Sequence, residues 1–269
     1  MFLKKLQDFT VQLTDYVSTV TGDWKIKGFI DVEQNIYTIS VDSKIISKII
    51  EVQLFPKLKE FADINGYDIV LAEHQNWYPD MSFVNKANPE EKYAIDIKTT
   101  YRKPGKQTHC NGFTLGSHGR YFKDRTSLKN IQFPYGEYKS HIALGVIYTR
   151  VVDVDIDETE ILSLDNLETI QSVIGELQFF AQEKWKIASD KGGSGNTANI
   201  GSITNIEDIV NGDGVFSKLG EDKFDLYWMN YKEQFIKNPK DRRKMIKLTS
   251  LNDFVDAYDL DPKLITKKR

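Results

Sequence analysis

The stretch Gln75-Asn76-Trp77-Tyr78-Pro79-Asp80, followed after a polar connection by Tyr93-Ala94-Ile95-Asp96-Ile97-Lys98, decides how this sequence is expected to fold. In the second segment, the two isoleucines alternate with Asp96 and Lys98. Successive side chains of a β-strand point to opposite faces. We therefore expect the isoleucines to enter a core, and Asp96 and Lys98 to share the opposite face.

A turn at Pro79-Asp80 would bring Asp80 beside this strand. Two carboxylates hold a hard cation such as Mg²⁺ through their oxygens. An ammonium such as that of Lys98 can hold a water or stabilise developing negative charge. This combination is typical of metal-assisted phosphodiester hydrolysis. The alternative is an ordinary half-buried strand with an ordinary Pro-Asp turn, and the spacing alone favours that alternative.

The composition is that of a globular chain without a membrane span. Of the 269 residues, 40% are hydrophobic and 28% are charged, as in ordinary globular domains, and no apolar run approaches the roughly 18 residues of a membrane span. The segment 1–8 mixes charged and apolar residues and does not resemble a signal peptide. Cys110 is the only cysteine, which excludes a disulfide within the chain. These features predict a cytoplasmic protein.

Charge is distributed unevenly along the chain. The net charge of −3 argues against a non-specific nucleic-acid coat protein. However, residues 98–129 contain one acid, Asp124, among the basic residues Lys98, Arg102, Lys103, Lys106, Arg120, Lys123, Arg125 and Lys129. Residues 237–269 form a second basic segment. Such segments suit a phosphate backbone, although a solvated surface of uneven charge is the alternative.

The first half of the chain has clear hydrophobic periodicities. They predict an amphipathic helix over 1–21, a hairpin over 24–41, a helix over 43–64 that Pro56 kinks or divides, and a strand over 67–73. Asp42 or Ser43 is expected to cap the second helix. A basic, glycine-containing connection is expected after Tyr101.

The second half is less regular. The apolar run 141–150 predicts a buried central strand, which 151–156 could extend. Residues 158–178 predict a weakly patterned helix, 179–188 another strand, and 205–269 mostly helices with basic loops. Phe224, Tyr227, Trp228 and Tyr231 recur at helical spacing, and this aromatic stripe is expected in the core.

A glycine-rich segment, Gly193-Ser194-Gly195-Asn196-Thr197, lies between these predicted elements. It is no phosphate-binding loop of the Walker type, because no Lys-Ser/Thr pair follows the glycines. One interpretation is a flexible surface turn. The other is a loop whose backbone approaches a partner closely, with Asn196 and Asn199 reading an adenine edge or holding the loop in shape.

Taken together, these segments resemble the EcoRV-type family of type II restriction endonucleases, within the PD-(D/E)xK nuclease superfamily. The resemblance extends from about residue 24 to about residue 231. It rests on segments that occur in the family's order, namely 75–80, 94–101, 113–116, 146–150 and 193–202. The Pro-Asp and Asp-x-Lys signature occurs in many nucleases, but its combination with the glycine-rich segment is specific.

The resemblance implies an α/β, restriction-endonuclease-like fold with a central mixed β-sheet flanked by helices. It also implies a homodimer that holds duplex DNA in a U-shaped cleft. The whole chain, 1–269, is then one domain. Its parts are a dimerisation part of about 1–60, a catalytic and DNA-recognition part of about 67–231, and a basic C-terminal extension, 232–269.

The resemblance also implies roles for individual residues. Asp80 and Asp96 would bind Mg²⁺, Lys98 would position the attacking water and stabilise the transition state, and Glu51 would join a second metal position. The role of Glu51 follows from the resemblance alone, because spacing favours a solvated glutamate. Base recognition would fall to Gly193, Ser194, Gly195, Asn196 and Thr197 in the major groove and to Gln75 and Asn76 in the minor groove. Contacts to the DNA backbone, or support for these loops, would come from Ser43, Thr99, Thr100, Thr114 and Asn199.

The implied activity is Mg²⁺-dependent hydrolysis of double-stranded DNA at GATATC. The cut falls in the middle of the site and leaves blunt ends with a 5′-phosphate and a 3′-hydroxyl. A cognate DNA methyltransferase is expected in the same system. A repair or structure-specific nuclease is an alternative. The glycine-rich segment disfavours it, because such an enzyme needs no base-reading loop. A non-catalytic DNA-binding module is a second rival, which the intact Asp80, Asp96 and Lys98 disfavour.

Overall fold

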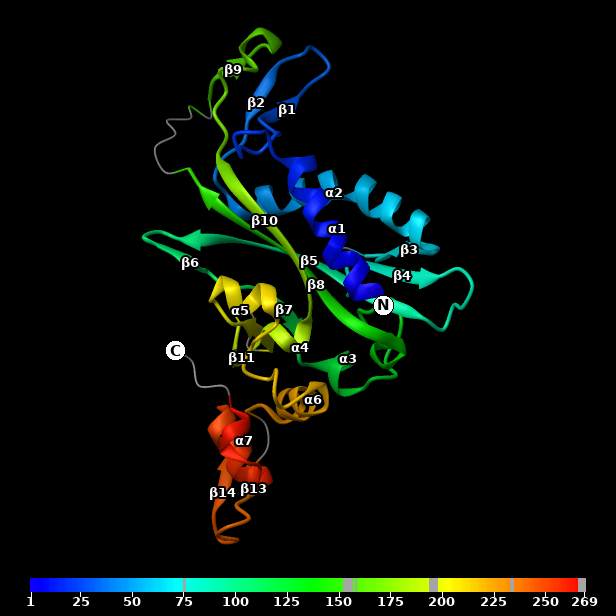
Figure 1. The fold of residues 1–269 in the computed structure, drawn as a ribbon, viewed down its shortest axis with the longest axis vertical. Helices are drawn as coiled ribbons and strands as arrows, with labels where there is room; N and C mark the ends of the chain where they lie inside the picture. Colours follow the sequence, from blue (N-terminus) through cyan, green and yellow to red (C-terminus); the bar gives the residue numbers. More distant parts are fainter. Residues whose placement is uncertain (75, 152–156, 158, 194–197, 233–234, 266–269) are drawn as a thin grey trace. The chain divides into compact units, whose positions relative to one another are not determined.

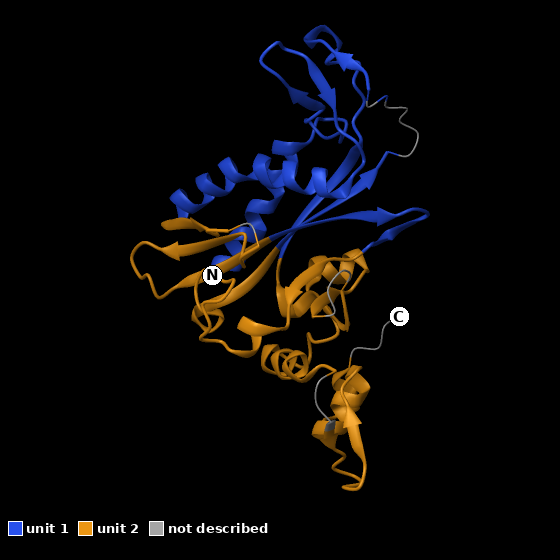
Figure 2. Ribbon diagram, turned by 180° about the vertical axis from the view of Figure 1, so that it is seen from behind, with its two compact units in different colours: residues 1–65, 97–111, 144–181 blue, residues 66–96, 112–143, 182–269 orange. Residues whose placement is uncertain are grey.

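The computed structural model of the chain describes residues 1–74, 76–151, 157, 159–193, 198–232 and 235–265. Helices and strands are interspersed along the sequence (Figure 1). The chain divides into two compact units (Figure 2). Unit 1 comprises Met1–Asn65, Ile97–Asn111 and Leu144–Ala181, and unit 2 comprises Gly66–Asp96, Gly112–Ala143 and Gln182–Arg269.

Unit 1 contains the two long helices expected near the N-terminus, α1 (Phe2–Val17) and α2 (Ser43–Asn65). The apolar stripe of α1 is buried, and its Phe9 ring lies 5.0 Å from that of Phe61 on α2. The carboxylate of Asp42 accepts a hydrogen bond from the backbone N–H of Lys44 at 2.7 Å, which confirms Asp42 as the cap. Pro56 lies inside α2 and does not divide it.

The predicted N-terminal hairpin is also present in unit 1. Strand β1 (Gly28–Ile30) pairs antiparallel with β2 (Ile36–Thr38), and β2 pairs with the short β9 (Ile161–Leu162). The carboxylate of Asp31 closes the turn, because it accepts hydrogen bonds from the backbone N–H groups of Glu33 and Asn35, each at 2.9 Å. This small sheet leaves several apolar side chains exposed, among them Phe29, Ile30 and Ile161.

A six-stranded sheet has the order β10-β8-β5-β4-β3, with β6 paired to β5. Its strands are β3 (Tyr67–Leu71), β4 (Met81–Asn85), β5 (Lys92–Lys103), β6 (Lys106–Cys110), β8 (Tyr138–Arg150) and β10 (Ile174–Glu183). Strand β8 is buried over most of its length, as the apolar run predicted. The predicted α/β fold with a central mixed sheet is confirmed.

Unit 2 also contains a second sheet, of three strands in the order β11-β12-β7. These are β7 (Thr114–Ser117), β11 (Ala188–Gly192) and β12 (Asn199–Ser202). The remaining elements of this unit are α3 (Arg120–Lys123), η1 (Tyr135–Glu137), α4 (Lys184–Ile187), α5 (Ile206–Asn211), α6 (Glu221–Asn230), β13 (Phe235–Lys237), β14 (Met245–Lys247), α7 (Leu251–Tyr258) and η3 (Pro262–Leu264). The aromatic stripe of α6 and Tyr231 is buried, which confirms its prediction as core.

The predicted helix over 158–178 is wrong. The described part of this segment contains β9, a 3-10 turn, η2 (Leu164–Asn166), and the start of β10. In β10, Ile174, Gly175 and Leu177 are buried, and burial is continuous from Phe179 to Gln182. Acidic and polar residues before Ile174 obscured this strand pattern in the sequence.

Two further predictions need correction. The strand predicted over 179–188 ends at Glu183, and Trp185 and Ile187 lie in the short helix α4. The connection after Tyr101 contains the strands β6 and β7. The proposed extension of β8 over 152–156 lies outside the described residues.

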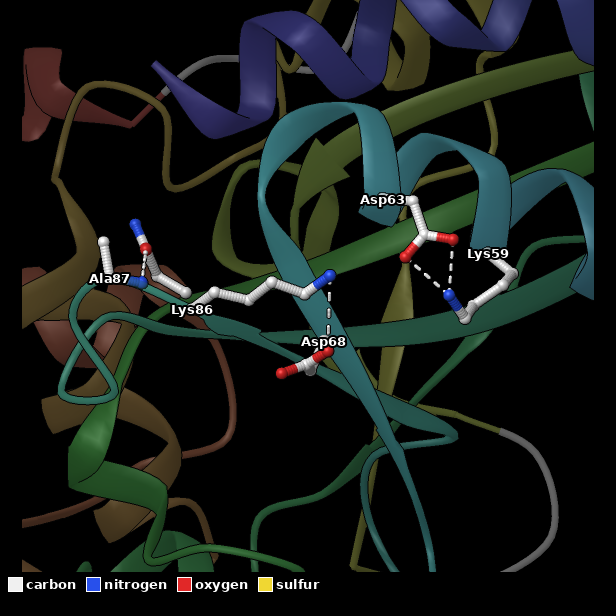
Figure 3. A network of polar contacts seen from close by, with 6 residues as sticks. Lys59, Asp63, Asp68, Lys86 and Ala87 are labelled. Atoms are coloured by element: carbon white, nitrogen blue, oxygen red, sulfur yellow. Dashed lines mark hydrogen bonds and ion pairs between the residues drawn. The ribbon is translucent and has the colours of Figure 1, made fainter.

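Ion pairs on the surface of each unit are solvated. In unit 2, Lys86 Nζ lies 3.5 Å from Asp68 Oδ1, and in unit 1 Lys59 pairs with Asp63 along α2 (Figure 3). All four side chains are 45–66% exposed. Exposed pairs of this kind contribute about 0–1 kcal/mol each, so the folds of the units depend on their apolar cores.

Gly145 on β8 is required by the packing of unit 1. A Cβ atom at this position would lie 2.0 Å from the ring of Phe180 on β10. We expect Gly145→Ala to lower the free energy of unfolding by about 1–3 kcal/mol, because the ring must move within a packed core. Urea denaturation measures this loss. Gly136→Ala is the control, since its Cβ would meet Arg125 at an ordinary 3.5 Å. Equal stability of the two variants would contradict the close packing at Gly145.

Candidate active site

The two candidate metal-binding carboxylates come from neighbouring antiparallel strands of unit 2. Asp96 lies within β5, and Asp80 directly precedes β4. Met81 pairs with Ile95 in this ladder, so the register continued by one residue sets Asp80 opposite Asp96. Directly opposed residues point to the same face, with Cβ atoms about 4.5–5.5 Å apart. Continued past Met81, this register would bring the two carboxylates together.

Asp96 lies in a largely buried setting. It is 8% exposed, and Ile95, its neighbour in β5, is fully buried as predicted. Burial raises the pKa of the Tyr78 and Tyr121 hydroxyls, and the negative charge of Asp96 raises both further. These tyrosines therefore stay neutral next to Asp96.

The other two candidates belong to unit 1. The boundary between the units falls after Asp96, so Lys98 lies in unit 1 although it is only two residues further along β5. Glu51 lies on α2, where its Oε1 atom is 2.7 Å from Lys48 Nζ. The side chain of Glu51 is 35% exposed, so it is accessible to a further ligand.

The donors of unit 2 suit a hard divalent cation. Within the described ranges, no three His, Cys, Asp or Glu side chains form a group that could hold a metal ion. Mg²⁺, however, is commonly held by one or two carboxylates, with waters and substrate phosphates completing its shell. Asp80 and Asp96 supply such a pair of oxygen donors. The residues present therefore fit Mg²⁺ without a cage of protein ligands.

The second sheet of unit 2 joins the two ends of the glycine-rich segment. The backbone N–H of Gly193 donates to the carbonyl of Asn199 at 2.8 Å. Thr114 of β7 pairs with Gly201 of β12, and Asn199 of β12 pairs with Ser117 of β7, so two residues of the predicted DNA interface, Thr114 and Asn199, share one sheet. A Cβ at Gly201 would lie 2.9 Å from the carbonyl oxygen of Lys191, so this close approach requires glycine. Residues 194–197 and Gln75, which were predicted to read bases, lie outside the described residues.

The family model for restriction endonuclease EcoRV matches residues 20–258. The type II restriction enzyme EcoRV of Escherichia coli is 37% identical over 209 residues, which cover 77% of this chain and 82% of that protein.

The chain belongs to the EcoRV restriction endonuclease family. It is therefore a type II restriction endonuclease, an enzyme that cleaves DNA at specific sites. The family match extends to residue 258 and so includes β13, β14 and α7, beyond the end expected from the motifs. In the described part of the chain, no helix is long and apolar enough to cross a membrane.

The remaining predicted DNA contacts of this EcoRV-family chain differ in exposure. Ser43 is exposed at the start of α2, and Asn76 is exposed in the turn before Asp80. Thr99 on β5 is partly exposed, whereas Thr100 is 5% exposed. The burial of Thr100 fits a supporting role better than a phosphate contact.

A buried polar cluster beside Asp80 was not predicted. Tyr78, Tyr135, His141 and Lys184 are each at most 6% exposed and lie in unit 2. Sequence reasoning treated His141 as the first residue of an apolar strand and Lys184 as part of another strand. The sequence feature that could have revealed the cluster is an aromatic residue, Tyr78, two positions before the candidate ligand Asp80.

Burial makes His141 a determinant of acid stability. Its pKa is well below the usual 6.5, first because of burial and then because of the Lys184 ammonium and the Arg125 guanidinium, while a hydrogen bond to the Tyr135 carbonyl opposes the shift. The unfolded chain therefore binds a proton below about pH 6.5 that the folded chain does not bind. The contribution of His141 to the free energy of unfolding is fully present above pH 6.5 and decreases as the pH falls.

We expect His141→Asn to reduce the slope of the free energy of unfolding against pH by up to about 1.4 kcal/mol per pH unit below pH 6.5. Urea denaturation between pH 4.5 and 7.5 measures the slope. His109→Asn, on β6 at a partly exposed position, serves as the control. An unchanged slope in His141→Asn would show that histidine 141 is protonated in the folded state.

Proposed function

We propose that this chain is a Mg²⁺-dependent endonuclease that cuts double-stranded DNA at GATATC. The cut falls in the middle of the site and yields blunt ends with a 5′-phosphate and a 3′-hydroxyl. The observation that carries this proposal is the β4–β5 register, which pairs Met81 with Ile95 in a member of this family and, continued by one residue, would set Asp80 opposite Asp96. The Gly-Ser-Gly-Asn-Thr segment supports the choice of recognition sequence.

Each catalytic residue has a distinct task in this proposal. Asp80 and Asp96 would hold the cation, and Glu51 would supply a second position. When bound, Mg²⁺ would neutralise the negative charge that repels the attacking oxygen from the phosphodiester. Lys98 lies on the same face of β5 as Asp96, by the alternation of a strand. Its ammonium group donates to the attacking water and stabilises charge that develops on the phosphate.

Base recognition is divided between two loops. Residues 193–197 read the major groove, where each base pair presents a distinct pattern of donors and acceptors. Gln75 and Asn76 contact the minor groove and lie four or five residues before Asp80. A loop displaced by a wrong sequence therefore also displaces a metal ligand. Ser43, Thr99 and Thr114 contact phosphates, which position the protein without reading sequence, and Thr100 and Asn199 support these contacts.

The proposed active form is a homodimer formed through residues 1–60. The hairpin of unit 1 supports this, because Phe29 on β1 and Tyr37 on β2 are paired across the hairpin and are 51% and 43% exposed. Exposed apolar side chains that lie together mark interaction surfaces. A dimer would give the two-fold symmetry of the palindrome GATATC. We further propose that the enzyme acts in the cytoplasm with a cognate DNA methyltransferase.

The first test of this function compares two plasmids that differ only in one GATATC site. With Mg²⁺ present, we expect linear product from the plasmid that contains the site and none from the other. Gel electrophoresis detects the product, and sequencing of its ends reveals the position of the cut. Cleavage of both plasmids at equal rates would rule out sequence-specific cutting.

Removal of one carboxylate tests the metal site. We expect Asp96→Ala to lose cleavage to below detection, because the remaining carboxylate holds the cation in the wrong place, while binding of the DNA duplex persists in a gel-shift assay. Asp68→Ala is the control, since Asp68 lies on β3 of the same unit with a solvated side chain (Figure 3). Turnover by Asp96→Ala at the rate of Asp68→Ala would place the active site elsewhere.

A further inference from the structure

The buried cluster that includes Tyr78 contains a hydrogen bond whose donor and acceptor can be assigned. Tyr78 Oη lies 2.9 Å from His141 Nδ1, and His141 Nε2 lies 3.2 Å from the carbonyl oxygen of Tyr135. A carbonyl oxygen can only accept, so Nε2 carries the proton. His141 is neutral, because burial and Lys184 lower its pKa. Nδ1 is therefore the acceptor, and the hydroxyl of Tyr78 donates to it.

The other members of the cluster fix the orientation of the two rings. The ring of Tyr135 stacks on that of His141 with centroids 3.6 Å apart, and the ring of Tyr121 stacks on that of Tyr78 at 5.5 Å. Lys184 Nζ lies 5.6 Å from the Tyr78 ring centroid and 5.7 Å from that of Tyr135. Aromatic stacking and cation–π contacts each add to the stability of such a cluster.

Tyr78 is also held through its backbone. Its N–H donates to the carbonyl of Asn130 at 3.1 Å, and its carbonyl accepts from the N–H of Gln132 at 2.9 Å. Side chain and backbone thus fix this residue on two sides, with one residue between it and Asp80. The chain has few rotatable bonds left between these fixed points and the Asp80 carboxylate.

We propose that Tyr78 is a positioning residue for Asp80. Its hydrogen bond to His141 holds the segment before β4 so that the Asp80 carboxylate meets Asp96 across the ladder and the pair binds a divalent cation. This inference rests on the proposed function of Asp80 and Asp96. A purely structural role of Tyr78 would change stability and leave the affinity for the cation as it is.

Two pairs of variants separate these roles. Tyr78→Phe removes the donating hydroxyl and keeps the ring, and Tyr135→Phe is its matched control, since its contacts with His141 use the ring and the backbone carbonyl. His141→Leu removes the acceptor, whereas His141→Asn keeps an acceptor near the position of Nδ1. The second pair tests the same hydrogen bond from its other side, should Tyr78→Phe not fold.

The readout is the affinity for Mn²⁺ of the DNA-free protein, measured as loss of the free-ion signal in electron paramagnetic resonance. Circular dichroism confirms that each variant is folded at the assay temperature. We expect about 10–100-fold weaker binding in Tyr78→Phe and His141→Leu, as for other residues that orient metal ligands. Tyr135→Phe should bind as the wild type does, and His141→Asn should recover part of the affinity that His141→Leu loses.

Cleavage kinetics provide the second readout. We expect Tyr78→Phe to need a higher Mg²⁺ concentration for half-maximal cleavage, with an unchanged KM for DNA. Wild-type Mn²⁺ affinity in folded Tyr78→Phe, or an equal loss in Tyr135→Phe, would overturn the positioning role. A wild-type protein that binds Mn²⁺ but cuts no DNA would instead overturn the proposed function, and the Mn²⁺ affinities would still decide the role of Tyr78.

Discussion

The pairing register of β4 and β5 is the constraint on which the candidate site depends. Because side chains alternate along a strand, a slip of one residue would send every side chain of β4 to the other face and remove Asp80 from Asp96. Polar contacts fix this register. Ser82 Oγ lies 2.7 Å from Gln132 Oε1 and 2.8 Å from Tyr138 Oη, and Ser82 is fully buried. A shifted strand would leave these groups buried without partners, which is costly.

Continued to Asp80, the same register would place two carboxylates opposite each other on one face of the sheet. Directly opposed carboxylates repel each other and destabilise the sheet. The aromatic neighbours of Asp96 stay neutral at physiological pH, because burial and Asp96 both raise the pKa of Tyr78 and Tyr121. A divalent cation bound by the two residues would relieve the repulsion between their carboxylates.

Much of the fold follows from periodicity, and the failures have physical causes. The helices α1 and α2 and the strand β8 could be predicted because their apolar stripes are long and regular. The segment before β10 mixes acidic residues with turns, so its short elements have no period to detect. The carboxylate pair was visible as a motif, but the spacing alone could not exclude an ordinary strand. Partners distant in sequence, such as His141 for Tyr78, are set by tertiary packing and leave no local pattern.

The hydrogen bond between Gly193 and Asn199 has a consequence for how new specificities arise in such enzymes. It joins backbone groups, so it does not depend on the side chains between the two residues. The strands β11 and β12 on either side are paired with each other, and β12 is paired with β7. If this segment reads bases as proposed, substitutions between the joined ends would change which bases are read while these backbone hydrogen bonds are kept. Natural sequence variation can therefore accumulate between Gly193 and Asn199 without changes at Asp80 and Asp96.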